Sequence, residues 1–394
     1  MPSITTIAPF RAARGHARRL LPWAAVLLLV ACDAGDRKAG KGGKAGKART
    51  RAAAIAAADA LLPLTSDTLR PVVITDTLPG DSDDPAIWVN GASPGSSLVL
   101  GTDKGDSTGG LYVFDLDGHV DRRRSRTPLW RMNNVDVEYA VRAPGAGADI
   151  AVSTERNRQV IRIFSLPDMT AIDGGGITVF DGNVDRAPMG IALYRRPRDG
   201  AVFAIVGGKS GPRDGYLAQY RLQFVDGRAT AALVRQFGRW SGRKEIEAIA
   251  VDDALGFVYY SDEGVGVRKY HADPDSGSAE LGLLASSGVR EDHEGLAIFA
   301  RDSTTGYVVL SDQGAGRIHV FAREGRAGAP HDQPVLAVIP VMARQTDGLD
   351  VTARGMGPAF PTGMLAMMSE RGAFHFYRWS DVQARIDAVM AARR

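Results

Sequence analysis

The chain of 394 residues contains a single cysteine, Cys32, so no intramolecular disulfide can stabilise it. A Cys-X-X-Cys pair is therefore excluded, and of the 7 histidines no other stands at ligand spacing from His293. A zinc site of the Cys/His type is not expected. The chain body also lacks a convincing Ser-His-Asp set and a phosphate-binding Gly-rich loop, which argues against a covalent nucleophile and against a P-loop nucleotidase.

Long hydrophobic runs are missing as well, apart from one near the amino terminus. Residues 20–31 are apolar but too short to span a bilayer as a mature helix, and several arginines precede them. Small residues just before Cys32 resemble the lipobox of bacterial lipoproteins. We therefore predict a lipoprotein signal peptide over residues 1–31, lipidation of Cys32, and a mature protein exported and anchored to a membrane of the bacterial cell envelope, on its periplasmic or cell-surface side. An ordinary signal peptide with an incidental cysteine is the alternative.

Residues 32–66 are rich in Lys, Gly and Ala and are predicted to form a flexible tether, because this composition cannot bury a core. Residues 1–60 hold 11 Lys or Arg and only 3 Asp or Glu, whereas the whole chain has a net charge of +3, so the remainder carries −5. An acidic folded part favours cations over nucleic acid as partners. We expect no nucleic-acid partner, and a domain over residues 67–394 that is a monomer.

A unit of roughly 50 residues recurs along this domain. Each unit opens with an acidic or small residue and a short apolar strand. A second apolar strand then ends in a polar cluster with Gly, and a last strand ends in an aromatic residue. Six units begin near residues 84, 134, 189, 247, 294 and 347. The repeat predicts an all-β fold, a six-bladed β-propeller, with a generic β-sandwich as the alternative.

Two segments lie outside the six units. Residues 67–77 precede the first unit and are predicted to close the ring by supplying an outer strand to the last blade. Ser380 and Asp381 are predicted to cap a short carboxyl-terminal helix, with Val382, Ile386 and Val389 on one face.

Equivalent positions of a propeller form a ring around its central channel, so polar residues that recur in the repeat should converge at one end. The converging carboxylates are Asp83, Asp84, Glu247, Glu263, Glu294 and Asp347, and the converging cations are Lys104, Arg156 and Lys209. Carboxylates brought together repel one another unless a cation holds them, and many oxygen ligands suit Ca²⁺. The three cations suit phosphate. The pattern indicates metal-assisted hydrolysis of a phosphate ester.

Two motifs carry a family resemblance. Residues 81–88, DSDDPAIW, closely resemble the first signature of the β-propeller phytases, and residues 133–137, NNVDV, resemble the second. The resemblance covers about residues 67–380. It implies a calcium-dependent phosphomonoester hydrolase, a 3-phytase-like enzyme. Such an enzyme releases phosphate from myo-inositol hexakisphosphate, or another phosphomonoester bound as its calcium complex, by attack of a metal-activated water.

The resemblance also implies roles for individual residues. The catalytic calcium cluster would comprise Asp83, Glu247, Glu263, Glu294 and Asp347, and the phosphate-binding cations would be Lys104, Arg156 and Lys209. One structural calcium site would use Asp84 with the backbone oxygens of Pro85 and Val135, and another would use Asp292, Glu294 and Gln313. The chain departs from the family pattern at Glu138, Met189 and Ala248, where a basic residue, a tyrosine and a glycine are usual.

Two other functions remain open at this point. The chain could be a non-catalytic, calcium-stabilised propeller lipoprotein that binds a ligand or a protein partner. A calcium-dependent propeller hydrolase of another ester, such as a lactone, is the third hypothesis. Lys104, Arg156 and Lys209 discriminate among them, because neither a scaffold nor a lactonase needs three phosphate-binding cations.

Overall fold

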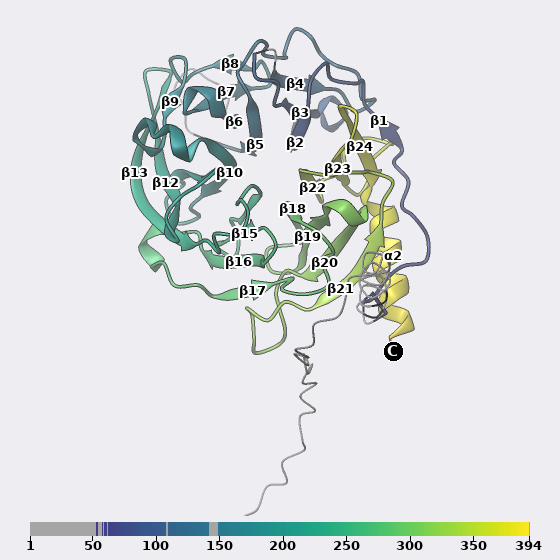
Figure 1. Cartoon of the computed structure of the whole chain (residues 1–394). Helices are drawn as coiled ribbons and strands as arrows, with labels where there is room; N and C mark the ends of the chain where they lie inside the picture. The colour runs from purple at the N-terminus through teal and green to yellow at the C-terminus, as the bar shows by residue number, and fades with distance from the viewer. Residues whose placement is uncertain are drawn as a thin grey trace, which may run out of the picture. The chain divides into compact units, whose positions relative to one another are not determined.

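The computed structural model describes residues 62–107, 109–141 and 149–393, together with positions 53, 57, 59 and 60. The predicted signal peptide, Cys32 and most of the predicted tether lie outside the described residues. Six antiparallel sheets are arranged around a central axis, with β2, β5, β10, β18 and β22 nearest the middle (Figure 1). This confirms the predicted all-β, six-bladed propeller. None of the helices among the described residues is long and apolar enough to cross a membrane.

The strands of each blade run outward from the axis in chain order, except that the outermost strand of blade six is β1. Blade one consists of β2 (Ser82–Trp88), β3 (Leu98–Asp103) and β4 (Gly110–Phe114). Blade two consists of β5 (Met132–Glu138), β6 (Asp149–Glu155), β7 (Val160–Leu166) and β8 (Thr170–Ala171), with β9 (Ile177–Thr178) also paired to β7. Blade three consists of β10 (Pro188–Arg195), β11 (Val202–Gly208), β12 (Asp214–Val225) and β13 (Arg228–Arg239).

The last three blades follow the same plan. Blade four consists of β14 (Ile249–Asp252), β15 (Phe257–Asp262), β16 (Gly266–His271) and β17 (Gly282–Leu284). Blade five consists of β18 (His293–Ala300), β19 (Gly306–Asp312), β20 (Arg317–Ala322) and β21 (Val335–Pro340). Blade six consists of β22 (Leu349–Thr352), β23 (Met364–Ser369), β24 (Ala373–Arg378) and β1 (Val73–Ile74).

The ring is closed by the amino-terminal strand. β1 pairs antiparallel with β24, placing Val73 opposite Phe376, so the predicted outer strand of the last blade is confirmed. Just upstream, Leu64 bridges to Val338 of blade five, and the Asp59 carboxylate pairs with Arg317 at 2.9 Å. These contacts lie in the segment predicted as tether, and the boundary at residue 66 stays a prediction.

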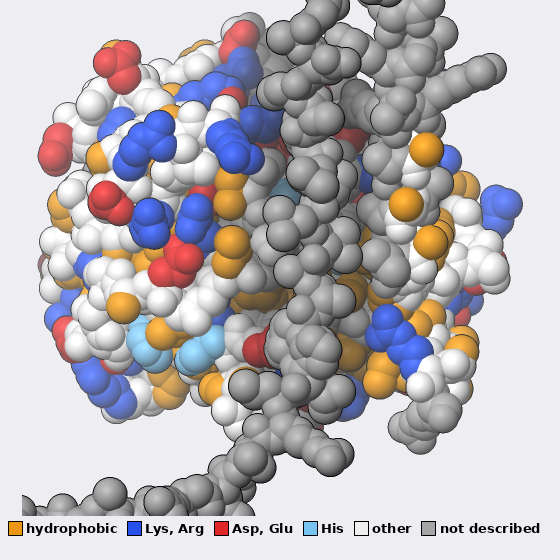
Figure 2. All heavy atoms as spheres, turned by 60° about the horizontal axis from the view of Figure 1, so that its bottom comes forward, with side chains coloured by type: hydrophobic (Ala, Val, Ile, Leu, Met, Phe, Trp, Pro, Cys, Tyr) orange, Lys and Arg blue, Asp and Glu red, His pale blue; other side chains and the backbone are white. Residues whose placement is uncertain are grey.

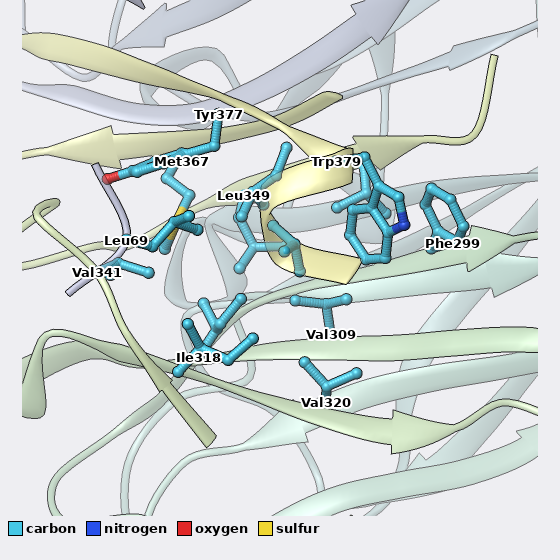
Figure 3. Close-up of a cluster of buried hydrophobic side chains, with 14 of the residues drawn as sticks. Leu69, Phe299, Val309, Ile318, Val320, Val341, Leu349, Met367, Tyr377 and Trp379 are labelled. Carbon is cyan, nitrogen blue, oxygen red and sulfur yellow. The ribbon is translucent and has the colours of Figure 1, made fainter. Parts of the chain in front are cut away.

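A hydrophobic core lies between blades five and six, where Val309, Ile318 and Val320 face Leu349 and Met367 (Figure 3). The helix α2 (Trp379–Ala392) extends this core and contacts β21 and β24 at the outer edge (Figure 1). Its first residue, Trp379, stacks on Phe299 with ring centroids 3.7 Å apart.

The helical face was predicted correctly, since Val382 and Ile386 are buried and Val389 packs against the same core. The predicted cap was wrong. The helix begins directly after β24, so Ser380 and Asp381 lie in its first turn and neither residue is the N-cap. The stacking of Trp379 on Phe299 places the helix start one residue before the predicted cap.

Hydrogen bonds between neighbouring blades hold the inner strands in place. Side-chain hydroxyls in second strands donate to carbonyl oxygens at or beside the start of the next blade's inner strand: Thr154 to Met189 (2.6 Å), Ser261 to Glu294 (3.0 Å) and Ser311 to Thr346 (3.1 Å). Farther along the inner strands, the Asp136 carboxylate accepts the Leu193 N–H, and the Asp350 carboxylate accepts the Ile87 N–H, each at 2.7 Å. The starts of the inner strands, where the recurring polar residues stand, are thereby fixed.

One face of the molecule carries side chains of mixed character. Over the coloured part of the face in Figure 2, basic and acidic side chains lie next to one another, with hydrophobic side chains among them. Interspersed charges of both signs are typical of a solvated surface.

Candidate active site

Four inner strands carry a register shift at their start. The shifts lie between Ser82 and Pro85 in β2, Met132 and Val135 in β5, Pro188 and Ile191 in β10, and His293 and Leu296 in β18. An irregularity of this kind re-aims side chains that would otherwise alternate strictly between the two faces of a sheet. The shift in β2 spans Asp83 and Asp84, so the side chains of these neighbours can lie in different surroundings.

Asp83 is the hub of a network that joins four blades. Its two carboxylate oxygens accept hydrogen bonds from Lys104 Nζ and from Asn133 Nδ2, both at 2.8 Å. Asn133 Nδ2 also donates to Glu247 Oε1 at 2.8 Å, and Lys104 Nζ donates to Asp347 Oδ2 at 2.6 Å. Residues more than 240 positions apart in the chain therefore meet at one end of the channel.

Two carboxylate triads lie beside this hub. In each triad, one oxygen from every residue lies within 4.8 Å of the others: Glu245, Glu247 and Glu263 form the first triad, and Glu263, Asp292 and Glu294 form the second. Glu263 belongs to both, so the triads are contiguous. Such oxygen-only donor sets fit a hard divalent cation.

Burial dominates the electrostatics of these carboxylates. It raises the pKa of Asp83 to about 6, although the charge of Lys104 opposes the shift. It raises the pKa of Glu263 to about 8, with Glu245 and Asp292 adding to the effect. The pKa values of Glu247 and Glu294 are raised well above their usual range for the same reason. Ionising these groups together needs additional positive charge.

A buried hydrogen-bond acceptor also indicates that these carboxylates need additional positive charge. Glu294 is 5% exposed, and its Oε2 has no hydrogen-bond partner among the described residues. A buried carboxylate oxygen without a donor is costly unless a cation supplies the missing interaction. The residues present therefore fit a divalent metal ion.

The three predicted phosphate-binding cations differ in burial and in the partners that hold them. Lys104 is held by Asp83 and Asp347, whose charges raise its pKa against the effect of burial. Arg156 is buried within electrostatic reach of Glu247, and its Nε has no partner among the described atoms. The Lys209 side chain is 49% exposed and pairs with Glu245. All three stand beside the carboxylate cluster.

Asp84 contacts a different set of residues from its neighbour Asp83. Its Oδ2 accepts the Val135 N–H at 3.1 Å, and with Pro85 and Val135 it lines a cavity of about 120 Å³ in the channel. Asn134 lines the same cavity, and its buried Oδ1 has no partner among the described atoms. A Cβ on Gly348 would lie 2.2 Å from Asp84 Oδ1, so only glycine allows blade six to approach this carboxylate.

Gln313 contacts Asp292, one of its predicted partners, and also Asp347 of the hub around Asp83. Its side-chain amide donates to Asp347, whereas its contact with Asp292 is a backbone hydrogen bond of 3.3 Å. Asp292 itself joins Glu263 and Glu294. Gln313 therefore connects the second triad to the Asp83 hub.

A sequence model described as Phytase matches residues 47–372. The chain belongs to the Phytase family. Its enzyme class is accordingly that of a phytase-type hydrolase. The 3-phytase of Bacillus subtilis (strain 168) is 28% identical over 296 residues, which are 72% of this chain and 73% of the relative. Among solved structures, the Kuenenia stuttgartiensis hydrazine synthase matches at 9% identity with a TM-score of 0.45, over 74% of this chain and 82% of that chain.

The positions at which this chain departs from the family's sequence pattern lie in different parts of the structure. Met189 is 1% exposed at the start of β10, and its backbone oxygen accepts the Thr154 hydroxyl. Glu138 closes β5, five residues and about 16 Å along the strand from Asn133. It lies 3.5 Å from Arg195 Nε, so it is not part of the carboxylate cluster.

Three residues of the cluster were missed by sequence reasoning. Glu245 completes the first triad, Lys244 pairs with Asp292, and Asn133 bridges Asp83 to Glu247. A signal for Glu245 exists in the sequence, because residues two apart in an extended segment face the same side and Glu247 is a predicted ligand. Lys244 had no such signal.

Proposed function

We propose that the protein is a calcium-dependent phytase that releases phosphate from myo-inositol hexakisphosphate or a similar phosphomonoester bound as its calcium complex. The observation that carries this proposal is the meeting of buried carboxylates from different blades with three cations at one end of the channel. Membership of the Phytase family supports the same reaction.

The carboxylates proposed to hold the catalytic calcium ions are Asp83, Glu247, Glu263, Glu294 and Asp347. Glu245 is an additional candidate, because it completes a triad with Glu247 and Glu263. Asp84, Pro85 and Val135 are proposed to hold a structural ion in the channel, and Asp292, Glu294 and Gln313 are proposed for another. When bound, the calcium ions would lower the pKa of a water molecule and neutralise charge on the phosphoryl group.

The chain's own residues position the reaction. Lys104 and Arg156 bind phosphoryl oxygens, and the planar guanidinium of Arg156 can contact two oxygens at once. Asn133 keeps the Asp83 and Glu247 carboxylates at a fixed separation through bonds of 2.8 Å to each. Lys209, half-exposed, reaches the outer phosphates of the substrate. These donors act on charge that grows in the transition state.

The non-catalytic propeller is disfavoured by family membership, and no separate observation favours the lactone hydrolase. Export and lipid anchoring through Cys32 remain a proposal that rests on the amino-terminal sequence. Metabolic labelling with a radioactive fatty acid tests it. Wild-type protein should incorporate label, and the Cys32→Ser variant should not.

Phosphate release from calcium phytate tests the enzyme. Wild-type protein should release phosphate, lose this activity in chelator, and regain it when calcium is restored. The Glu247→Gln variant is the control, and wild-type release no greater than that of the variant rejects the proposal. Chelator should also lower the melting temperature, since ions bound to the native state stabilise it by mass action. An unchanged melting temperature rejects structural calcium.

A further inference from the structure

Lys244 precedes the first triad in the chain but pairs with the second. Its Nζ donates to Asp292 Oδ1, and the lysine side chain is 50% exposed. This hydrogen bond is the main cause of the raised pKa of Lys244, and the charges of Glu263 and Glu294 add to it. The ammonium group is therefore held by Asp292 within electrostatic reach of the other two carboxylates of the second triad.

Lys209 has a matching arrangement on the first triad. Its ammonium pairs with Glu245, one of the three carboxylates there, and its side chain is 49% exposed. In both triads, then, one carboxylate at the edge holds a half-exposed lysine. Lys209 is a proposed phosphate ligand, so the matching position assigns the same chemistry to Lys244.

Lys104 provides a contrast. It is 18% exposed and held by both Asp83 and Asp347, so it cannot leave without unpairing two carboxylates, of which Asp83 is buried. Lys244 has one carboxylate partner and a flexible four-carbon stem. It can leave Asp292 at little cost and remain close to the site.

A lysine and a divalent cation compete for the same oxygen. Asp292 needs its free lone pairs to join Glu263 and Glu294 around a cation, and two positive charges at that distance repel. We propose that Lys244 is a tethered counter-ion of the Glu263–Asp292–Glu294 triad. Calcium displaces it from Asp292, and the released ammonium then binds a substrate phosphate. This inference rests on the proposed function and couples metal binding to phosphate binding.

The coupling between metal binding and phosphate binding can be measured without substrate hydrolysis. Calcium binding to metal-free protein is followed by titration calorimetry for wild type, Lys244→Met and Arg243→Met. Arg243 is the matched control, since it is the adjacent exposed residue, carries the same charge and donates to the Gly264 carbonyl at 3.3 Å. Calcium should bind Lys244→Met about fivefold or more tightly than wild type, within the range of coupled sites, and should bind Arg243→Met as it binds wild type.

A second titration tests the released lysine. Inorganic phosphate is added to the calcium-loaded proteins, and its affinity for Lys244→Met should fall by about fivefold or more. Lys244→Arg keeps a cation and should retain phosphate binding. Melting temperatures of the metal-free variants confirm that each is folded before it is titrated.

Several outcomes overturn the inference. Unchanged calcium affinity in Lys244→Met rejects the competition, and equal shifts in both Met variants attribute the effect to long-range charge. Unchanged phosphate affinity rejects the released ligand. If wild type hydrolyses calcium phytate but any of these negative results is obtained, the inference about Lys244 fails and the proposed function stands. If none of the proteins binds calcium, the inference fails together with the calcium dependence of the proposed function.

Discussion

Asp262 and Glu263 are neighbours at the end of β15, yet their surroundings are opposite. Asp262 is fully buried and accepts hydrogen bonds from the Ser241 N–H and hydroxyl and from Arg268 Nε, at 2.7 to 2.9 Å. Glu263 is 6% exposed, and its burial among other carboxylates raises its pKa to about 8. Burial is similar in the two residues, so they differ in the hydrogen-bond donors that the chain supplies to them.

The contrast extends around the ring. A supporting set closes the second strands of four blades, namely Asp103, Glu155, Asp262 and Asp312, and each member accepts backbone N–H groups from nearby loops. In three blades an arginine of the third strand adds a charged donor: Arg162, Arg268 and Arg317. The site set consists of Asp83, Glu247, Glu263 and Glu294, whose pKa values are raised. The supporting set stabilises the fold by itself, whereas the site set requires a cation.

The largest expected effect comes from the site member of the adjacent pair. Glu263→Gln removes the carboxylate shared by both triads and should lower phosphate release about 10²–10³-fold, the usual loss when a key electrostatic group is removed. Metal-free protein should become more stable, because an amide avoids burying a charge. Phosphate release and the melting temperature in chelator measure the two effects. A lower melting temperature in chelator would place Glu263 in the supporting set.

Substitution of Asp262, the member of the pair in the supporting set, should affect stability more than activity. Asp262→Asn leaves the buried Arg268 with a weaker partner and should lower the free energy of unfolding by about 3 kcal/mol. Denaturant unfolding of metal-free protein measures this change, with Glu263→Gln as the control. Activity per folded molecule should fall far less than in that control. Equal losses of activity in the two variants would contradict the distinction between the sets.

The pH dependence of stability should differ with and without calcium. A carboxyl group whose pKa is raised on folding binds its proton more tightly in the native state, so the native state loses stability as pH rises. For Glu263 this loss runs from about pH 4.5 to about pH 8. The melting temperature of metal-free protein should therefore fall across that interval. Glu263→Gln should make this fall shallower, since Asp83, Glu247 and Glu294 keep their raised pKa values. Saturating calcium should reduce the fall further, and a profile that rises across the interval would contradict the assignment.

Much of the fold follows from the repeat. Six units in phase predict six blades, and ring geometry converts equal positions in the repeat into proximity, which is why Asp83, Glu247 and Asp347 could be grouped from the sequence. The closing strand β1 was predictable for the same reason, because a ring needs one strand from the opposite end of the chain.

The remaining features depend on contacts outside the repeat. Lys244 and Glu245 lie in the connection between blades three and four, outside the repeated strands, and only the fold shows that Asp292 lies within reach. The repeat also marks Asp262 and Glu263 alike as polar residues at a strand end. Their separation depends on Ser241 and Arg268, which no local pattern connects to them.

The smallest expected effect concerns Asp81, which shares the acidic loop with Asp83 but belongs to neither set. Its side chain is 69% exposed and 4.0 Å from Lys104 Nζ, and only its backbone N–H contributes to the supporting set, by donating to Asp103. Asp81→Asn should change the free energy of unfolding by less than about 0.5 kcal/mol and phosphate release by less than about twofold, as expected for an exposed pair. A tenfold loss of calcium affinity in this variant would place Asp81 in the site set. The side chains of the site would then extend to the open end of the channel, and exposure could no longer separate a metal ligand from a solvated carboxylate in this loop.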